Sequence, residues 1–337
     1  MTMTRRDVFR VTTAVPLVIA VLLGMPGPAT VRGATVTSTH GHAPASTVRN
    51  GPLTIATIDR GIWSIDSRGH AHQVFPCTPP RCYDLESIDW APGGRRLVFS
   101  VTTVTAKSSY NGIHVITPST GADRHLCPRG VHFPHLCPEG FSFAWSPDGK
   151  RIAYVIPGAV GHIYLMNPDG SDRTLLRTGT GGLDSSPSWS PDGRQIAFAT
   201  GGGHRSSISL VNRDGSHRRL VFRGVTPPGL PIGSPNPSPW PDWSPDGTRI
   251  AFQWGCGIKV VTLQGKDATP RSANTSRLCF GLPGAPVWSP DGHEIAMGVR
   301  GFGTYIMDAD GSHLTRVSTE DGRGMFGTAR PSWQPLP

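Results

Sequence analysis

Four aspartates recur at one position of a repeated pentapeptide, and they are the first residues to consider for chemistry. The pentapeptide is Trp-Ser-Pro-Asp-Gly, and its aspartates are Asp148, Asp192, Asp246 and Asp291. Paired carboxylates can carry out general acid–base catalysis. An identical position in every copy instead indicates a structural role, because an aspartate in a turn accepts backbone N–H groups and shapes the hairpin. We therefore interpret these four carboxylates as turn residues.

A second set of candidates lies in segments of irregular length between the copies. Its members are charged or aromatic residues that precede a repeat tryptophan or follow the apolar run after the turn: Glu86, Asp89, Phe141, Asp184, His204, Arg205, Asp242, Arg300, Phe326 and Arg330. Long loops on a rigid β scaffold commonly carry recognition. We predict that these ten residues form a ligand- or partner-binding surface. In an enzyme, His204 with Asp184 or Glu86 would supply the reacting groups.

The signatures of catalysis and of metal binding are incomplete. The sequence has no Gly-x-Ser-x-Gly nucleophile elbow, and the repeats take up the length that a peptidase domain would need. Asn167–Ser171 and Asp308–Ser312 resemble calcium loops but lack the downstream bidentate glutamate, so we interpret both as turns. We predict no catalytic residue, no metal ion and no cofactor.

The repeat tryptophans set the period of the chain. They are Trp90, Trp145, Trp189, Trp243, Trp288 and Trp333, separated by 55, 44, 54, 45 and 45 residues. Self-similarity at this period is typical of stacked units of about four strands each, as in a propeller. A tryptophan at the same phase of every unit would fill the space between neighbouring sheets.

Short apolar runs supply the strands of these units. Runs such as Arg151–Val155 and Arg249–Phe252 are too short for helices and are bounded by Gly and Pro. Three further runs have no Trp-Ser-Pro turn ahead of them: Leu53–Ile58, Ile62–Ile65 and Gln73–Phe75. Near the other end, Arg330–Trp333 is a first strand with nothing after it. These runs predict an all-β, six-bladed β-propeller of four-stranded antiparallel blades, in which the C-terminal strand joins the N-terminal blade and closes the ring.

The threading of a propeller places the candidates on one face. The Ser-Pro-Asp-Gly turns and the Asp-Gly tails would share one face. The irregular loops that hold the ten candidates would lie on the opposite face, around the mouth of the central channel. A channel mouth is a concave site where ligands commonly bind.

The repeat also resembles a known family. Trp-Ser-Pro-Asp-Gly-x-x-Ile-Ala-Phe, followed by Ile-Tyr-x-Met-x-x-Asp-Gly, is similar to the WD-repeat-like blade of the TolB family of β-propellers over about residues 53–335. The chain departs from this pattern at Trp90, where the turn lacks Asp, and at Thr262–Asp267, which replaces an Asp-Gly tail. The resemblance implies the propeller fold. It implies little about function, and without the additional N-terminal domain of TolB we expect no Tol–Pal role.

The first residues are typical of an export signal. Met1–Arg10 is basic, and Val11–Leu23 is apolar but too short to span a bilayer comfortably. We predict a cleavable signal over residues 1–34, a flexible leader over 35–52 and a single propeller domain over 53–337. Arg5 and Arg6 fit a twin-arginine signal, and they also fit an ordinary secretory signal. After cleavage we expect no membrane span and a periplasmic, cell-surface or secreted protein.

The six cysteines fall into local pairs. An even number of cysteines in an exported chain favours disulfides. We predict pairing within single blades or their junction loops: Cys77 with Cys82, Cys127 with Cys137, and Cys256 with Cys279. A metal site formed with His125, His132 and His135 is the alternative, although the spacing matches no standard zinc pattern.

The composition narrows the class of partner. The formal net charge is +9, without a clustered Lys/Arg stripe interleaved with aromatic residues, so we predict no nucleic-acid binding. We predict an exported, monomeric, non-catalytic scaffold that binds a protein, a peptide or an envelope polymer. The alternatives are a propeller lyase or hydrolase that acts on a carbohydrate at the channel mouth, and a mainly structural surface protein.

Overall fold

The structure is a computed structural model. It describes residues 50–57, 61–77, 84–104, 109–126, 142–156, 161–180, 183–202, 205–225, 239–255, 257–270, 283–299, 303–317 and 330–336. The predicted signal over residues 1–34 lies outside these residues, as does the predicted leader except at its end. Over the described ranges the secondary structure consists of strands.

The described strands form six antiparallel sheets, which we call blades 1 to 6. Blade 1 contains β23 (Ser332–Pro335), β1 (Asn50–Thr57), β2 (Gly61–Ile65) and β3 (Ala71–Phe75). Blade 2 contains β4 (Asp84–Trp90), β5 (Leu97–Val104), β6 (Ser109–Thr117) and β7 (Ala122–His125). Blade 3 contains β8 (Phe143–Trp145), β9 (Ile152–Ile156), β10 (His162–Met166) and β11 (Thr174–Leu175).

The remaining three blades follow in chain order. Blade 4 contains β12 (Asp184–Trp189), β13 (Gln195–Gly202), β14 (Arg205–Asn212) and β15 (Arg219–Val225). Blade 5 contains β16 (Asp242–Trp243), β17 (Arg249–Trp254) and β18 (Gly257–Thr262). Blade 6 contains β19 (Pro283–Trp288), β20 (Glu294–Val299), β21 (Gly303–Asp308) and β22 (Thr315–Arg316).

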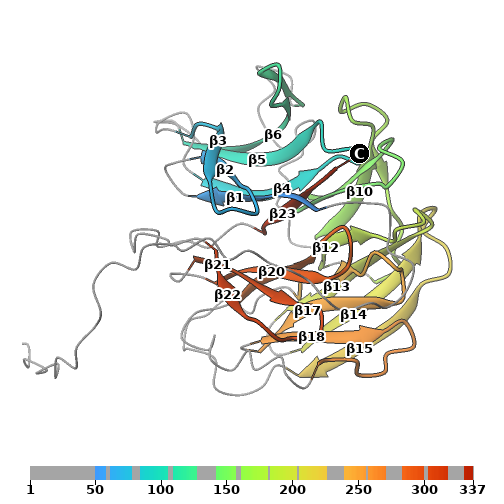
Figure 1. Cartoon of the computed structure of the whole chain (residues 1–337). Helices are drawn as coiled ribbons and strands as arrows, with labels where there is room; N and C mark the ends of the chain where they lie inside the picture. The colour runs from blue at the N-terminus through green and yellow to red at the C-terminus, as the bar shows by residue number, and fades with distance from the viewer. Residues whose placement is uncertain are drawn as a thin grey trace, which may run out of the picture. The chain divides into compact units, whose positions relative to one another are not determined.

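The first strands of the blades form the inner ring of the propeller. β4, β8, β12, β16 and β19 each contact the first strand of the next blade, and β23 contacts both β19 and β4. The C-terminal strand pairs with β1, with Leu53 opposite Trp333 (Figure 1). The all-β six-bladed propeller and its closure by the C-terminal strand are therefore confirmed.

Two details of the strands differ from the prediction. β1 begins at Asn50 rather than Leu53, because Asn50 pairs with Pro335 across a register shift and so belongs to the closing sheet. Blade 5 has three described strands, and an isolated bridge between Val261 and Asp267 stands in place of its fourth. This blade is the one whose Asp-Gly tail is replaced in the sequence.

The repeated aspartates have the structural role predicted for them. In the turn after β8, Ser146 Oγ donates to Asp148 Oδ1 at 2.6 Å, and the same oxygen accepts the N–H of Lys150 at 3.0 Å. Ser146 Oγ also accepts the N–H of Arg151 at 2.8 Å. Each of the other turns repeats the Ser–Asp bond: Ser190–Asp192 at 2.6 Å, Ser244–Asp246 at 2.5 Å and Ser289–Asp291 at 2.7 Å. Gly149 has a φ of 67°, the left-handed conformation that glycine adopts without strain.

The repeat tryptophans pack between neighbouring blades, as expected. Trp145 lies in one cluster with Val98 and Ile113 of blade 2 and with Tyr154 of its own blade. Trp189 is placed in the same way between blades 3 and 4. Buried aromatic area at every blade junction joins the six sheets into one ring.

Candidate functional site

The residue before each repeat tryptophan lies on the inner ring, and several of these side chains bind the next blade. Asp89 Oδ2 accepts the N–H of Trp145 at 2.7 Å, and Asp242 Oδ2 accepts the N–H of Trp288 at 2.8 Å. At the equivalent position of the closing strand, Ser332 Oγ accepts the N–H of Trp90 at 3.3 Å. This position therefore connects inner strands of adjacent blades.

Arg330 joins the two aspartates in what we call the axial triad, which consists of Asp89, Asp242 and Arg330. Its Nη2 donates to Asp242 Oδ1, and the side chains of the pair are 8% and 12% exposed. Arg330 precedes β23 and bridges Ser87 of β4 through its backbone. Its side chain thus connects blade 1 to blade 5, past blade 6.

The charges of the axial triad do not balance when both carboxylates are ionised. Burial raises the pKa of Asp89 to about 6, although the Arg330 charge and the Trp145 N–H oppose the shift. Burial also raises the pKa of Asp242, again opposed chiefly by Arg330. One guanidinium lies close to the charges of the buried Asp242 and the partly buried Asp89, and Asp89 retains its proton more readily than an ordinary aspartate does. Both aspartates also accept backbone N–H groups of the next blade, so the triad connects neighbouring blades.

The other predicted candidates are not brought into this triad. Asp184 is 1% exposed, and its Oδ1 accepts the hydroxyls of Thr180 at 2.7 Å and Thr200 at 3.0 Å. Its Oδ2 accepts the Thr178 hydroxyl, so this carboxylate holds the segment before β12 in place. Arg205 is exposed at the start of β14. The side chain of Glu86 lies outside the described residues, as do Phe141, His204, Arg300 and Phe326.

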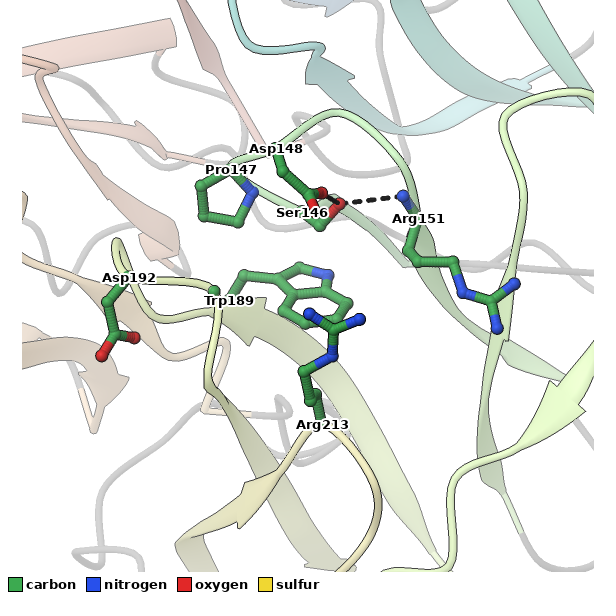
Figure 2. Close-up of a pocket in the computed structure, with 8 residues that line it drawn as sticks. Ser146, Pro147, Asp148, Arg151, Trp189, Asp192 and Arg213 are labelled. Carbon is green, nitrogen blue, oxygen red and sulfur yellow. Dashed lines mark hydrogen bonds between the residues drawn. The ribbon is translucent and has the colours of Figure 1, made fainter.

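A pocket lies at the Ser-Pro-Asp-Gly end of the strands, opposite the end at which Arg205 begins β14. It lies between the turns of blades 3 and 4. Its volume is about 280 Å³, and it is lined by Ser146, Pro147, Asp148, Arg151, Trp189, Asp192, Gly193 and Arg213. Figure 2 shows the Trp189 indole between the Ser146–Asp148 turn and the side chain of Arg213. We call this hollow the turn-face pocket.

Most charged groups of the turn-face pocket are held by their own blades. Arg151 Nη1 donates to Asp172 Oδ2 at 2.6 Å and to Asn167 Oδ1 at 2.9 Å. The Ser146 hydroxyl lowers the pKa of Asp148, and the charge of Arg213 lowers it further. Arg213 itself is exposed, and no other described residue forms a hydrogen bond or an ion pair with its guanidinium. The pocket therefore offers one cation without an ion-pair partner among the described residues, beside the turn carboxylates Asp148 and Asp192 and the edge of the buried Trp189 indole.

The sequence held a signal for this pocket that the prediction did not use. Arg213 occupies the second position of the Asn-Arg-Asp-Gly tail, where the equivalent residues of other blades are Pro168 and Ala309. A long cation at a position that otherwise holds a small or apolar residue distinguishes this blade. The repetition of the Ser-Pro-Asp-Gly turns indicates a structural role for their aspartates and gives no reason to expect a pocket beside them.

Cys77 is buried and disulfide-bonded. The other five cysteines lie outside the described residues, so the three predicted pairs stay predictions. Among the described residues, no group of three or more His, Cys, Asp or Glu side chains could hold a metal ion. The described part of the chain also contains no helix long and apolar enough to cross a membrane.

Solved structures share this fold. TolB from Acinetobacter baumannii aligns with a TM-score of 0.60 at 18% identity, over 84% of this chain and 66% of that one. A putative TolB from Agrobacterium tumefaciens aligns with a TM-score of 0.56 at 18% identity, over 81% of this chain and 90% of that one. A chain from a nidogen/laminin complex gives a TM-score of 0.63 at 11% identity, over 84% and 98%.

These likenesses define the class of the protein. The chain has the TolB-like six-bladed propeller fold, as the resemblance implied. No family model and no curated protein matches the sequence. At identities below one fifth, the shared property is the fold alone.

Proposed function

We propose that the chain is an exported, non-catalytic propeller that binds a protein, a peptide or an envelope polymer. The observation that carries this proposal is the turn-face pocket, in which the Arg213 guanidinium is available beside Trp189. Arginine and tryptophan are among the residue types most enriched at energetically important positions of protein interfaces.

The hydrogen bonds that the carboxylates of the inner ring and of Asp184 already accept support a non-catalytic role. Asp89 and Asp242 bind backbone N–H groups of the next blades, and Asp184 binds three threonine hydroxyls. A general acid or base needs a proton-transfer atom within reach of a substrate. These three carboxylates hold parts of the propeller together instead.

The available cation defines the chemistry of the preferred partner. Arg213 would pair with a carboxylate, such as an acidic side chain or the C-terminus of an extended peptide. A neighbouring apolar group of the same partner would pack against Pro147 and the accessible part of Trp189. Electrostatic attraction would speed the encounter, and binding should therefore weaken with added salt.

Export is the second part of the proposal. The basic segment Met1–Arg10 and the apolar segment Val11–Leu23 support a signal peptide. Sequencing the N-terminus of the protein recovered outside the cytoplasm tests this directly. An N-terminus near Thr35 is expected, whereas an intact Met1 with all protein in the cytoplasm would contradict export.

A capture experiment tests the binding role and locates its face. Wild-type protein and three charge-reversal variants, R213E, R194E and R205E, are incubated with an envelope fraction. Arg194 is the matched control, because it lies in the neighbouring turn with a side chain 84% exposed but does not line the pocket. Arg205 represents the predicted loop face.

The captured component is identified, purified and titrated against each protein. Loss of a charge-assisted contact of about 1.5–3 kcal/mol should weaken binding roughly 10- to 150-fold in R213E and leave R194E near wild type. A selective loss in R205E would place the binding site on the loop face. If wild type captures nothing that survives purification and titration, the scaffold proposal is wrong.

A further inference from the structure

Two histidines face each other on the outer hairpin of blade 2. His114 on β6 is directly opposite His125 on β7 in the antiparallel register. Their ring centroids are 4.7 Å apart, with the ring planes inclined at 43°. Directly opposite side chains of an antiparallel pair are close enough to bind one small group together.

The Nε2 atoms of both rings lie close to Gly112. A Cβ built on Gly112 would lie 2.5 Å from His125 Nε2 and 3.5 Å from His114 Nε2. The two Nε2 atoms are therefore at most 6.0 Å apart. Tetrahedral zinc with Zn–N bonds of about 2.0–2.1 Å needs its nitrogens about 3.3 Å apart, which small rotations of the rings can provide. Glycine inside a strand is typical of such a close approach.

The His114 ring is held with its Nε2 toward this point. Asp123 accepts from Nδ1, with oxygens at 2.9 and 3.1 Å, which leaves the lone pair on Nε2. The ring also stacks on Phe99 with a centroid distance of 5.4 Å and an interplanar angle of 14°. A carboxylate on the second nitrogen is the usual outer-shell partner of a metal-bound histidine.

We propose that His114 and His125 form a two-imidazole site for a divalent transition metal ion, with Asp123 as the outer-shell partner of His114. Imidazole nitrogens suit Zn²⁺, Ni²⁺ and Cu²⁺ better than Ca²⁺ or Mg²⁺. The described residues supply two protein ligands to this site. It is independent of the turn-face pocket and of the proposed binding role.

The test is Zn²⁺ titration of the purified chain without a histidine tag, followed by calorimetry and by competition with a chromophoric chelator. H125A should lower the affinity at least tenfold, and H114A should have a similar effect. D123N should weaken binding roughly 10- to 100-fold, because it removes the charge that orients the first ring. G112A keeps both imidazoles but places a methyl group where their Nε2 atoms meet, and it should also lose the site.

His313 supplies the control. Its Nδ1 lies 2.8 Å from Asp308 Oδ2, so it reproduces the His–Asp pair, and no second histidine is paired across the strand from it in the described sheet. H313A should bind Zn²⁺ like wild type. Equal affinity in wild type and H125A would overturn the proposal, as would retention of the site in G112A. Folding is verified for each variant by circular dichroism, and H125A and G112A decide the outcome if H114A does not fold.

Discussion

Replacing Asp89 by Asn should stabilise the propeller at neutral pH and have little effect near pH 4. The carboxylate is partly buried in the inner ring, and its pKa in the folded protein is about 6 against an ordinary value of 3.8. The folded state therefore binds the proton more tightly than the unfolded state does. The stability linked to this proton is fully present below pH 3.8 and is lost as the pH rises through about 6.

The size of the effect follows from the shift. A difference of about two pKa units at about 1.4 kcal/mol each corresponds to roughly 3 kcal/mol of unfolding free energy at pH 8. Asn retains an oxygen for the N–H of Trp145, which Asp89 now accepts at 2.7 Å, and carries no charge. Its amide nitrogen can donate to the Ser332 hydroxyl in place of the present bond.

Urea unfolding of wild type and D89N at several pH values from 4 to 8 measures the effect. The difference in unfolding free energy should grow with pH and level off above about pH 7. D89A is the companion variant, because it removes the charge and also leaves the Trp145 N–H without an acceptor. A difference between D89N and wild type that does not vary with pH would refute this electrostatic account of the axial triad.

Three further substitutions test the charge pairing of the axial triad, the packing of a repeat tryptophan and the hydrogen bond of a turn. R330M leaves the carboxylates of Asp89 and Asp242 without a cation and should destabilise the protein by about 3–5 kcal/mol at pH 8. The loss should be smaller at pH 5, because the pKa values of both carboxyls are raised and protonation removes their charge. The same urea series measures both values. W189A removes an indole that is 7% exposed and donates from Nε1 to Ala144 O at 3.1 Å; it should cost about 3–5 kcal/mol in thermal and urea unfolding. S190A removes the hydroxyl that lowers the pKa of Asp192, so that pKa should rise in an NMR titration. An unchanged titration would contradict the turn geometry.

The repeat made the fold predictable from sequence. Trp-Ser-Pro-Asp-Gly specifies a strand end, a tight turn and the next strand, so each copy determines its local structure without reference to the rest of the chain. The closing strand was also predictable, because Arg330–Trp333 matches the start of a blade that lacks its continuation. The boundary at Asn50 was not, since it depends on pairing with Pro335 at the far end of the chain.

The site was predictable only in part. The sequence predicts Asp89, Asp242 and Arg330 as polar residues near the channel, and the structure places all three on the inner ring. Their present contacts could not be predicted, because the Trp145 and Trp288 N–H groups that the two carboxylates accept lie more than forty residues away in the sequence. No local pattern in the sequence reports such contacts.

The position of the axial triad explains why a propeller would tolerate buried charge. The closing strand β23 is not continuous with β1 in the chain, so the ring is closed there by non-covalent contacts. Arg330 extends those contacts to blade 5, and Ser332 extends them to Trp90 of blade 2. A buried ion pair adds little net stability compared with apolar packing, but it specifies which groups must meet. The triad therefore specifies where the closing segment docks on the ring, and partners are to be sought at exposed groups such as Arg213.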